Sequence, residues 1–187
     1  MANYKHASNH KGGVLREGWK KTMEGKLIIN VDAAFGEDSD DGGIGVVIRD
    51  HRGECISCAQ RHLPHVADAA VVEAFAFREG LQIAQQVGMN SFAIHTDCLQ
   101  VVQTINDGGF SATSASAVYT DCNILLAGFD NVLVKHCNRK ANVVAHELAR
   151  NSVAMSRTCV WDYDPRSFIF ASLVNDVTLL SNQESSP

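Results

Sequence analysis

The chain has 187 residues, of which 45% are hydrophobic and 20% are charged, and its formal net charge is −5. This size and composition are typical of one soluble globular domain of about 100 to 150 residues with tails, and no apolar run approaches the roughly 18 residues of a membrane span. The acidic balance is not typical of a domain that binds nucleic acid strongly. Without such an apolar run we expect no membrane partner, and we expect a monomer.

The basic residues are concentrated at the start of the chain. Residues 1–26 carry a net charge of +4, which leaves −9 for the remainder. Because residues 1–25 lack hydrophobic periodicity, we expect a flexible basic N-terminal arm. This segment also lacks the apolar core of a secretory signal, so we expect an intracellular protein, nuclear or cytoplasmic and not secreted, with its six cysteines as free thiols.

Two of the cysteines, Cys55 and Cys58, have the spacing of a zinc or redox pair. They lie in an expected strand, where residues three apart point to opposite faces, and the chain has no second pair of this spacing to complete a tetrahedral site. We therefore expect no metal site there.

The first expected strand, residues 27–35 (LIINVDAAF), contains a single carboxylate, Asp32. Strand alternation places Asp32 on one face with Ile28 and Asn30. A carboxylate in such a strand costs several kcal/mol, roughly, unless it is paired, protonated or bound to a metal. Asp32 therefore either meets partners from elsewhere in the chain or caps a loop amide at the strand end.

Alternating and helical hydrophobic patterns predict the remaining elements. Further strands are expected at residues 44–48, 55–62, 91–96 and 132–136, and helices at 66–87, 98–107, 114–128 and 140–155. Short connections make the first three strands an antiparallel meander, and a right-handed crossover places the fourth strand parallel to the first.

The predicted fold is α/β, with a mixed five-stranded sheet of order 3-2-1-4-5, strand 2 antiparallel, and helices on both faces. The domain is expected to span residues 26–155. A C-terminal tail at 156–187 follows, and we expect its apolar patch, residues 168–174, to pack partly on the domain.

Two further acids are expected beside Asp32. Glu73 falls on the inward stripe of its helix with Phe77 and Ala84, and Asp97 ends the fourth strand. In an open sheet the carboxyl ends of strands meet at the switch point, so we expect the three carboxylates within about 5 Å of one another. They cannot all stay ionised at that distance without a cation, which predicts Mg²⁺ or Mn²⁺.

Four segments together resemble the ribonuclease H domain, especially its plant reverse-transcriptase-like branch, over about residues 26–152. They are the Asp32 strand, VVEAFAFREGL around Glu73, TDCLQVV at Asp97, and HCNRKANVVAHELA. The resemblance implies a ribonuclease H-like fold and a two-metal endonuclease that hydrolyses the RNA strand of RNA–DNA hybrids.

The resemblance also implies roles for individual residues. Asp32 is the ligand shared by both metals, Glu73 holds the second metal and assists the attacking water, and Asp97 holds the water-activating metal. His136 takes the place of a mobile histidine that assists product release, or is an ordinary strand-end histidine. Asn142 and the cations Arg139 and Lys140 are implied nucleic-acid contacts.

The fourth metal ligand departs from the family pattern. Its position, one helical turn after Asn142, is occupied by His146 instead of an acid. An imidazole binds divalent metal but supplies no negative charge and favours softer ions than Mg²⁺. Activity is therefore expected to be weakened, shifted in metal preference or lost.

Two functions remain open on this basis. One is a metal-dependent endonuclease, in a host-retained or retroelement-derived domain. The other is a catalytically weak or inactive nucleic-acid-binding or interaction module that kept the fold.

Overall fold

The computed structural model describes residues 24–109, 112–162 and 167–174. Nearly all of the expected basic arm and much of the expected C-terminal tail therefore lie outside the described residues. No helix in the described ranges is long and apolar enough to cross a membrane.

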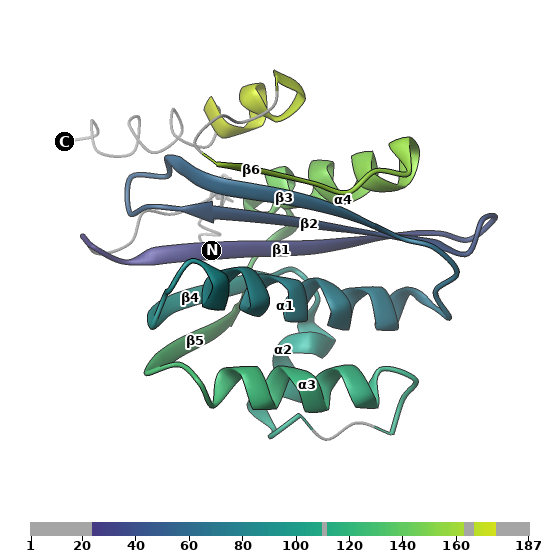
Figure 1. The fold of residues 1–187 in the computed structure, drawn as a ribbon, viewed down its shortest axis with the longest axis horizontal. Helices are drawn as coiled ribbons and strands as arrows, with labels where there is room; N and C mark the ends of the chain where they lie inside the picture. The colour runs from purple at the N-terminus through teal and green to yellow at the C-terminus, as the bar shows by residue number, and fades with distance from the viewer. Residues whose placement is uncertain (1–23, 110–111, 163–166, 175–187) are drawn as a thin grey trace, which may run out of the picture.

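One mixed sheet organises the described part of the chain (Figure 1). Its strands are β1 (Leu27–Gly36), β2 (Asp41–Arg49), β3 (Cys55–Leu63), β4 (Ser91–Thr96), β5 (Asn131–His136) and β6 (Cys159–Asp162). They lie in the order β5-β4-β1-β2-β3-β6, with β1–β4 and β4–β5 parallel and the other pairs antiparallel. The predicted order of the first five strands and the antiparallel strand 2 are confirmed.

The predicted count of five strands is wrong, because the tail supplies the sixth. β6 pairs along β3, and the Ser57 hydroxyl donates a hydrogen bond to the Asp162 carboxylate at 2.8 Å. A four-residue strand is too short for its alternation to be recognised, and its position depends on the free edge of β3. Residues 167–174 form a helix in which Ile169 and Leu173 are buried.

Helices cover both faces of the sheet, as predicted (Figure 1). They are α1 (Ala69–Gln86), α2 (Leu99–Asn106), α3 (Ser116–Leu126) and α4 (Val143–Met155). The first three pack on the face that carries Val46 and Ile48, whereas α4 packs on the opposite face against Val47. Successive side chains of β2 therefore pack alternately into two separate cores, one on each face of the sheet.

Local chemistry sets the start of α1 and the position of α4. The Asp68 carboxylate accepts a hydrogen bond from the Val71 amide at 2.9 Å, so α1 begins at Ala69, three residues later than the pattern predicted. On the other face, a Cβ at Gly45 would overlap the backbone carbonyl of Ala145. Glycine at this position lets α4 lie directly on β2.

Candidate active site

Asp32 forms a hydrogen bond with a residue near the C-terminal end of the domain. Its side chain points to the α4 face of β1 and is 5% exposed, and its Oδ2 lies 2.7 Å from Nδ1 of His146 on α4. The expectation that a buried carboxylate in this strand requires a partner is met by His146, the residue that the resemblance places at the fourth ligand position.

Asn142 joins the ends of two strands to the start of α4. Its amide nitrogen donates to Oδ1 of Asp97 and to the backbone carbonyl of Val31, both at 3.0 Å. Its amide oxygen accepts a hydrogen bond from Asn30 at 3.1 Å. Because Asn142 is fully buried and both ends of its amide are engaged, it acts here as a positioning residue. A contact between Asn142 and nucleic acid stays a prediction.

Asn30, which donates a hydrogen bond to Asn142, is a residue of this network that was not predicted from the sequence. The available signal was its position on the Asp32 face of β1, two residues earlier. A second buried polar side chain on a strand face requires a partner just as the first one does.

Burial and neighbouring negative charge disfavour the ionised forms of Asp32 and Glu73. Burial, a hydrogen bond to Asp97 and the negative charges of Asp97 and Glu73 raise the pKa of Asp32 to about 9. Burial and the charge of Asp97 raise the pKa of Glu73 to about 7, against the opposing effect of Arg139. In the metal-free protein at neutral pH, Asp32 therefore holds a proton.

The contact between Asp32 and His146 is consequently a hydrogen bond between neutral groups. Burial, followed by the charges of Arg139 and Arg150, lowers the pKa of His146. Although the short distance also fits an ion pair, a protonated Asp32 and a neutral imidazole agree with both pKa shifts. Nδ1 of His146 is engaged by Asp32, whichever of the two groups donates the proton, so Nε2 is the nitrogen left for another partner.

Glu73 contributes a buried atom that lacks a hydrogen-bond partner. Its Oε2 is inaccessible to solvent and accepts no hydrogen bond from any described residue. Carboxylate oxygens are the ligands that Mg²⁺ and Mn²⁺ prefer, and a cation would relieve the repulsion among these acids. In ligand type and charge, Asp32, Glu73 and Asp97 therefore fit a divalent metal.

The expected ligand cluster is not formed, however. Within the described ranges, no three His, Cys, Asp or Glu side chains lie close enough together to hold one metal ion. Asp32 also bonds His146 and Asp97 also bonds Asn142, so each of these acids has a partner outside the group of acids. Metal binding would have to draw these side chains together.

The remaining predicted site residues surround this network. Nε2 of His136 lies 3.2 Å from the backbone carbonyl of Asp97, and the His136 residue is exposed at the end of β5. Arg139 and Lys140 are exposed on the short 3₁₀ helix η1 (Arg139–Ala141). Arg139 is near enough to Glu73 and His146 to lower the pKa of each.

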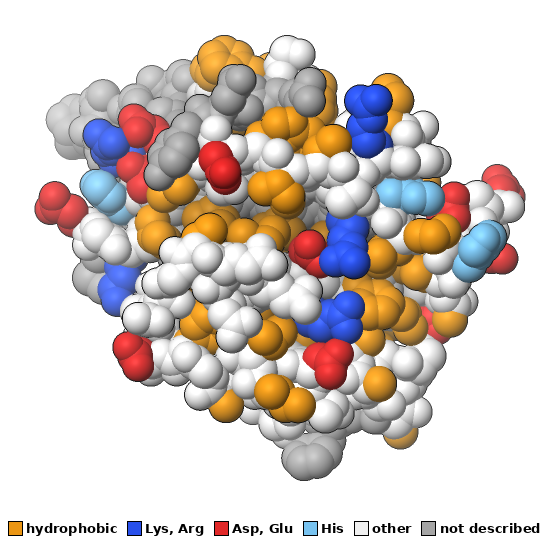
Figure 2. All heavy atoms as spheres, viewed as in Figure 1, with side chains coloured by type: hydrophobic (Ala, Val, Ile, Leu, Met, Phe, Trp, Pro, Cys, Tyr) orange, Lys and Arg blue, Asp and Glu red, His pale blue; other side chains and the backbone are white. Residues whose placement is uncertain are grey.

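The surface over α1 and α3 offers no extended basic patch. Figure 2 shows scattered Lys and Arg side chains on this face, several of them beside acids. Arg61 pairs with Glu79 at 2.6 Å, and Arg78 pairs with Asp121 at 2.9 Å. Two of the described arginines are therefore neutralised by neighbouring acids.

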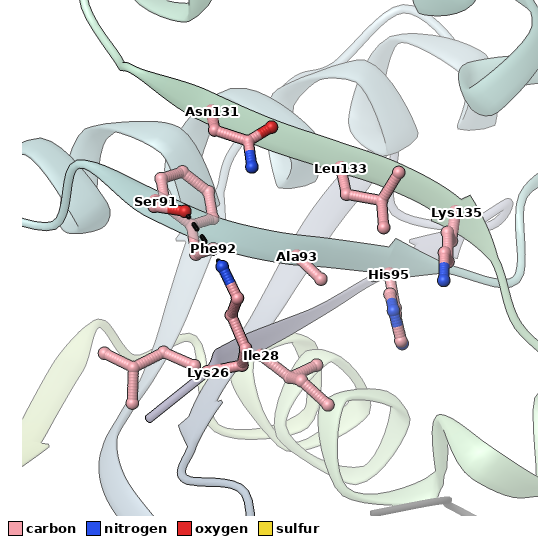
Figure 3. A pocket seen from close by; sticks show the side chains of 10 residues that line it. Lys26, Ile28, Ser91, Phe92, Ala93, His95, Asn131, Leu133 and Lys135 are labelled. Carbon is pink, nitrogen blue, oxygen red and sulfur yellow. Dashed lines mark hydrogen bonds between the residues drawn. The ribbon is translucent and has the colours of Figure 1, made fainter. Parts of the chain in front are cut away.

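A cavity of about 640 Å³ lies over β1, β4 and β5 (Figure 3). Its lining includes Lys26, His95, Leu133 and Lys135 and contains no acid. Burial and the charge of Lys135 lower the pKa of His95 to about 4, so this imidazole is neutral. None of the predicted site residues lines the cavity.

The chain matches the model of a protein family described as reverse transcriptase-like, over residues 30–152. This match covers all three acids, Asn142 and His146. No curated protein matches the chain significantly in sequence.

Solved structures of ribonucleases H share the fold. Ribonuclease H1 from the halophilic archaeon Halobacterium salinarum is 20% identical, with a TM-score of 0.63 over 70% of this chain and 99% of its own. LC11 ribonuclease H1, which came from compost and was solved in complex with an RNA/DNA hybrid, is 19% identical, with a TM-score of 0.63 and the same coverages. The protease–reverse transcriptase of prototype foamy virus is 14% identical, with a TM-score of 0.55 over 67% of this chain and 20% of its own.

Proposed function

The chain belongs to the reverse transcriptase-like family, and from this premise we propose that its ribonuclease H-like domain is a metal-dependent endonuclease that cuts the RNA strand of RNA–DNA hybrids. The observation that carries the proposal is that Asp97 and Glu73 raise the pKa of the buried Asp32, and Asp97 raises that of Glu73, in a network that also holds His146 and Asn142. Buried acids that cannot all ionise are costly to a fold unless they serve a ligand.

Asp32, Glu73 and Asp97 are the proposed holders of Mg²⁺ or Mn²⁺, with Nε2 of His146 as a further ligand. When bound, the metals supply positive charge that activates water and stabilises the leaving oxygen. Asn142 orients Asp97 through the hydrogen bond at 3.0 Å, and Arg139 and Lys140 offer positive charge to the phosphate backbone.

The direct test is cleavage of an end-labelled RNA–DNA hybrid by the purified full chain with Mg²⁺ or Mn²⁺. We expect cuts in the RNA strand of the hybrid but not in single-stranded RNA, double-stranded RNA or double-stranded DNA of the same sequence. Asp32→Asn should abolish cleavage with either ion. Asp130→Asn is the matched control, because Asp130 is an exposed acid that follows α3. Equal activity of Asp32→Asn and wild type would contradict the proposal.

The second candidate is a catalytically weak module that binds nucleic acid or another partner. Two observations favour it, namely the histidine in the fourth ligand position and the absence of a preformed ligand group among the described residues. Binding of the labelled hybrid in a gel-shift assay without cleavage under either metal would select this function.

A further inference from the structure

A bulge in β3 changes the relation between Cys55 and Cys58. β3 pairs with β2 so that Cys58 faces Val47 and Ser57 faces Ile48, but the next pair joins Cys55 to Arg49. Ile56 is therefore an extra residue, and the register shifts between Ile48 and Arg49.

Because of this extra residue, the expectation that the two thiols point to opposite faces is wrong. Val47 and Arg49 are two residues apart on β2 and share one face, so their partners Cys58 and Cys55 share that face as well. The general rule for residues three apart applies to a regular strand and fails at a bulge.

Both cysteines pack into the same core, between the sheet, α4 and the helix at residues 167–174. Cys58 is 1% exposed and contacts a cluster that includes Leu148 and Ile169, and the half-buried Cys55 packs at the edge of this cluster. Both thiols are free. One half-buried and one buried cysteine therefore lie on one face of β3.

We propose that Cys55 and Cys58 form a dithiol–disulfide couple, in which Cys55 attacks the oxidant and Cys58 resolves the intermediate.

The local electrostatics agree with this division of roles. The interaction with the Cys58 thiol, together with the positive charge of Arg49, lowers the pKa of Cys55 against the opposing effect of burial. The interaction with Cys55, followed by burial, raises the pKa of Cys58. Since the thiolate is the nucleophile, Cys55 reacts first.

With oxidised glutathione as oxidant, the couple exchanges two electrons in two steps. The Cys55 thiolate attacks one sulfur of glutathione disulfide, which forms a mixed disulfide and releases one glutathione thiolate. Cys58 then loses its proton and attacks the Cys55 sulfur, which breaks the mixed disulfide and releases the second glutathione thiolate. The two thiols are oxidised to one disulfide, glutathione disulfide is reduced, and the two protons pass to the released thiolates.

The sequence makes this couple easy to measure. Trypsin cuts after Arg52 and Arg61, so residues 53–61 (GECISCAQR) form one peptide that carries both cysteines. The native full chain is incubated with oxidised glutathione, denatured, blocked with a maleimide and digested. We expect peptide 53–61 without maleimide and lighter by two hydrogen atoms than the reduced peptide, whereas Cys98, Cys122 and Cys137 carry maleimide.

Variants separate the two roles. In Cys58→Ala, Cys55 should keep a glutathionyl group, because the resolving thiol is missing. In Cys55→Ala, the buried Cys58 should stay reduced, and in wild type the maleimide should modify Cys55 at least about tenfold faster than Cys58. Cys122→Ala is the matched control, because Cys122 is a buried cysteine in the other core.

Three outcomes would overturn the proposal. The first is a reduced peptide 53–61 after an incubation that oxidises other cysteines. The second is a disulfide between Cys58 and Cys159, which lies diagonally across on β6. The third is equal oxidation of Cys58 in wild type and in Cys55→Ala.

Discussion

At the scale of single residues, His146 should set the metal preference of the proposed site. It places an uncharged imidazole, bound to Asp32 through Nδ1 at 2.7 Å, where the family resemblance implies a fourth acid. A site with one imidazole ligand should work better with Mn²⁺ than with Mg²⁺, because Mg²⁺ prefers oxygen ligands and strict octahedral geometry. The ratio of hybrid cleavage rates with the two ions measures this preference.

His146→Asp restores the fourth carboxylate and should raise Mg²⁺-dependent cleavage by about tenfold or more, the size of effect typical of changes around metal ligands. His51→Asp in the β2–β3 hairpin adds the same charge away from the site and should leave the rate unchanged. If His146→Asp stays folded and remains inactive with both ions, the defect lies in substrate binding, and the binding module becomes the better function.

The raised pKa of Asp32 predicts how stability depends on pH in the metal-free protein. The pKa of Asp32 rises from 3.8, its ordinary value in an unfolded chain, to about 9 in the folded protein, so the folded state binds the proton more tightly. The stabilisation that this proton gives the fold is fully present below the unfolded pKa and is lost as pH rises through the folded pKa. In the presence of a chelator, the melting temperature should therefore fall between about pH 5 and pH 9.

Asp32→Asn removes the titrating group and should flatten this pH dependence, whereas Asp130→Asn should keep it. Metal binding displaces the proton from Asp32, so Mn²⁺ should bind more tightly at higher pH. It should therefore raise the melting temperature of wild type more at about pH 8 than at about pH 6. A melting temperature that rises with pH in the chelator would contradict the protonated state of Asp32.

At the scale of elements, the site depends on how closely α4 approaches β2. Gly45→Ala would place a Cβ against the Ala145 carbonyl, next to His146, so α4 has to move. We expect a loss of about 1 to 3 kcal/mol in the free energy of unfolding, as for other overpacked sites. Urea unfolding measures it, and Gly128→Ala is the control, because its Cβ would meet only the Leu125 carbonyl, at 3.3 Å.

Elements with a long hydrophobic pattern could be predicted from the sequence, and elements defined by pairing could not. The Asp32 strand and α1 each have enough residues for alternation or helical periodicity to stand out. β6 has four residues and exists through its pairing with β3, and the bulge at Ile56 appears only in the register with β2.

The same limit applies to the site. A buried Asp32 predicts that some partner exists, but the identity of His146 required knowing where α4 packs, 114 residues later in the chain. The link between Asn30 and Asn142 spans 112 residues, and nothing in either local sequence indicates it. The hydrophobic pattern of an element could therefore predict candidate site residues within that element. The contacts between residues on different elements could be identified only from the folded structure.

At the scale of the whole molecule, charge is divided between the start of the chain and the domain. Residues 1–23 carry a net charge of +4, so the rest of the chain carries −9. An acidic domain repels a nucleic-acid backbone, and the exposed cations of η1 are Arg139 and Lys140. If the proposed function holds, the basic arm should supply much of the attraction to the hybrid.

Deletion of residues 1–23 should therefore weaken hybrid binding and reduce its dependence on salt. Each lost phosphate contact removes about 0.9 from the slope of log affinity against log salt concentration. Fluorescence anisotropy with a labelled hybrid, over a series of salt concentrations, measures both effects. A matched variant that replaces the five Lys and Arg residues of this segment with Gln keeps its length and should reproduce the deletion. If the slope is unchanged in both variants, the arm makes no phosphate contacts, and the hybrid must be held by the cations of η1 and the domain alone.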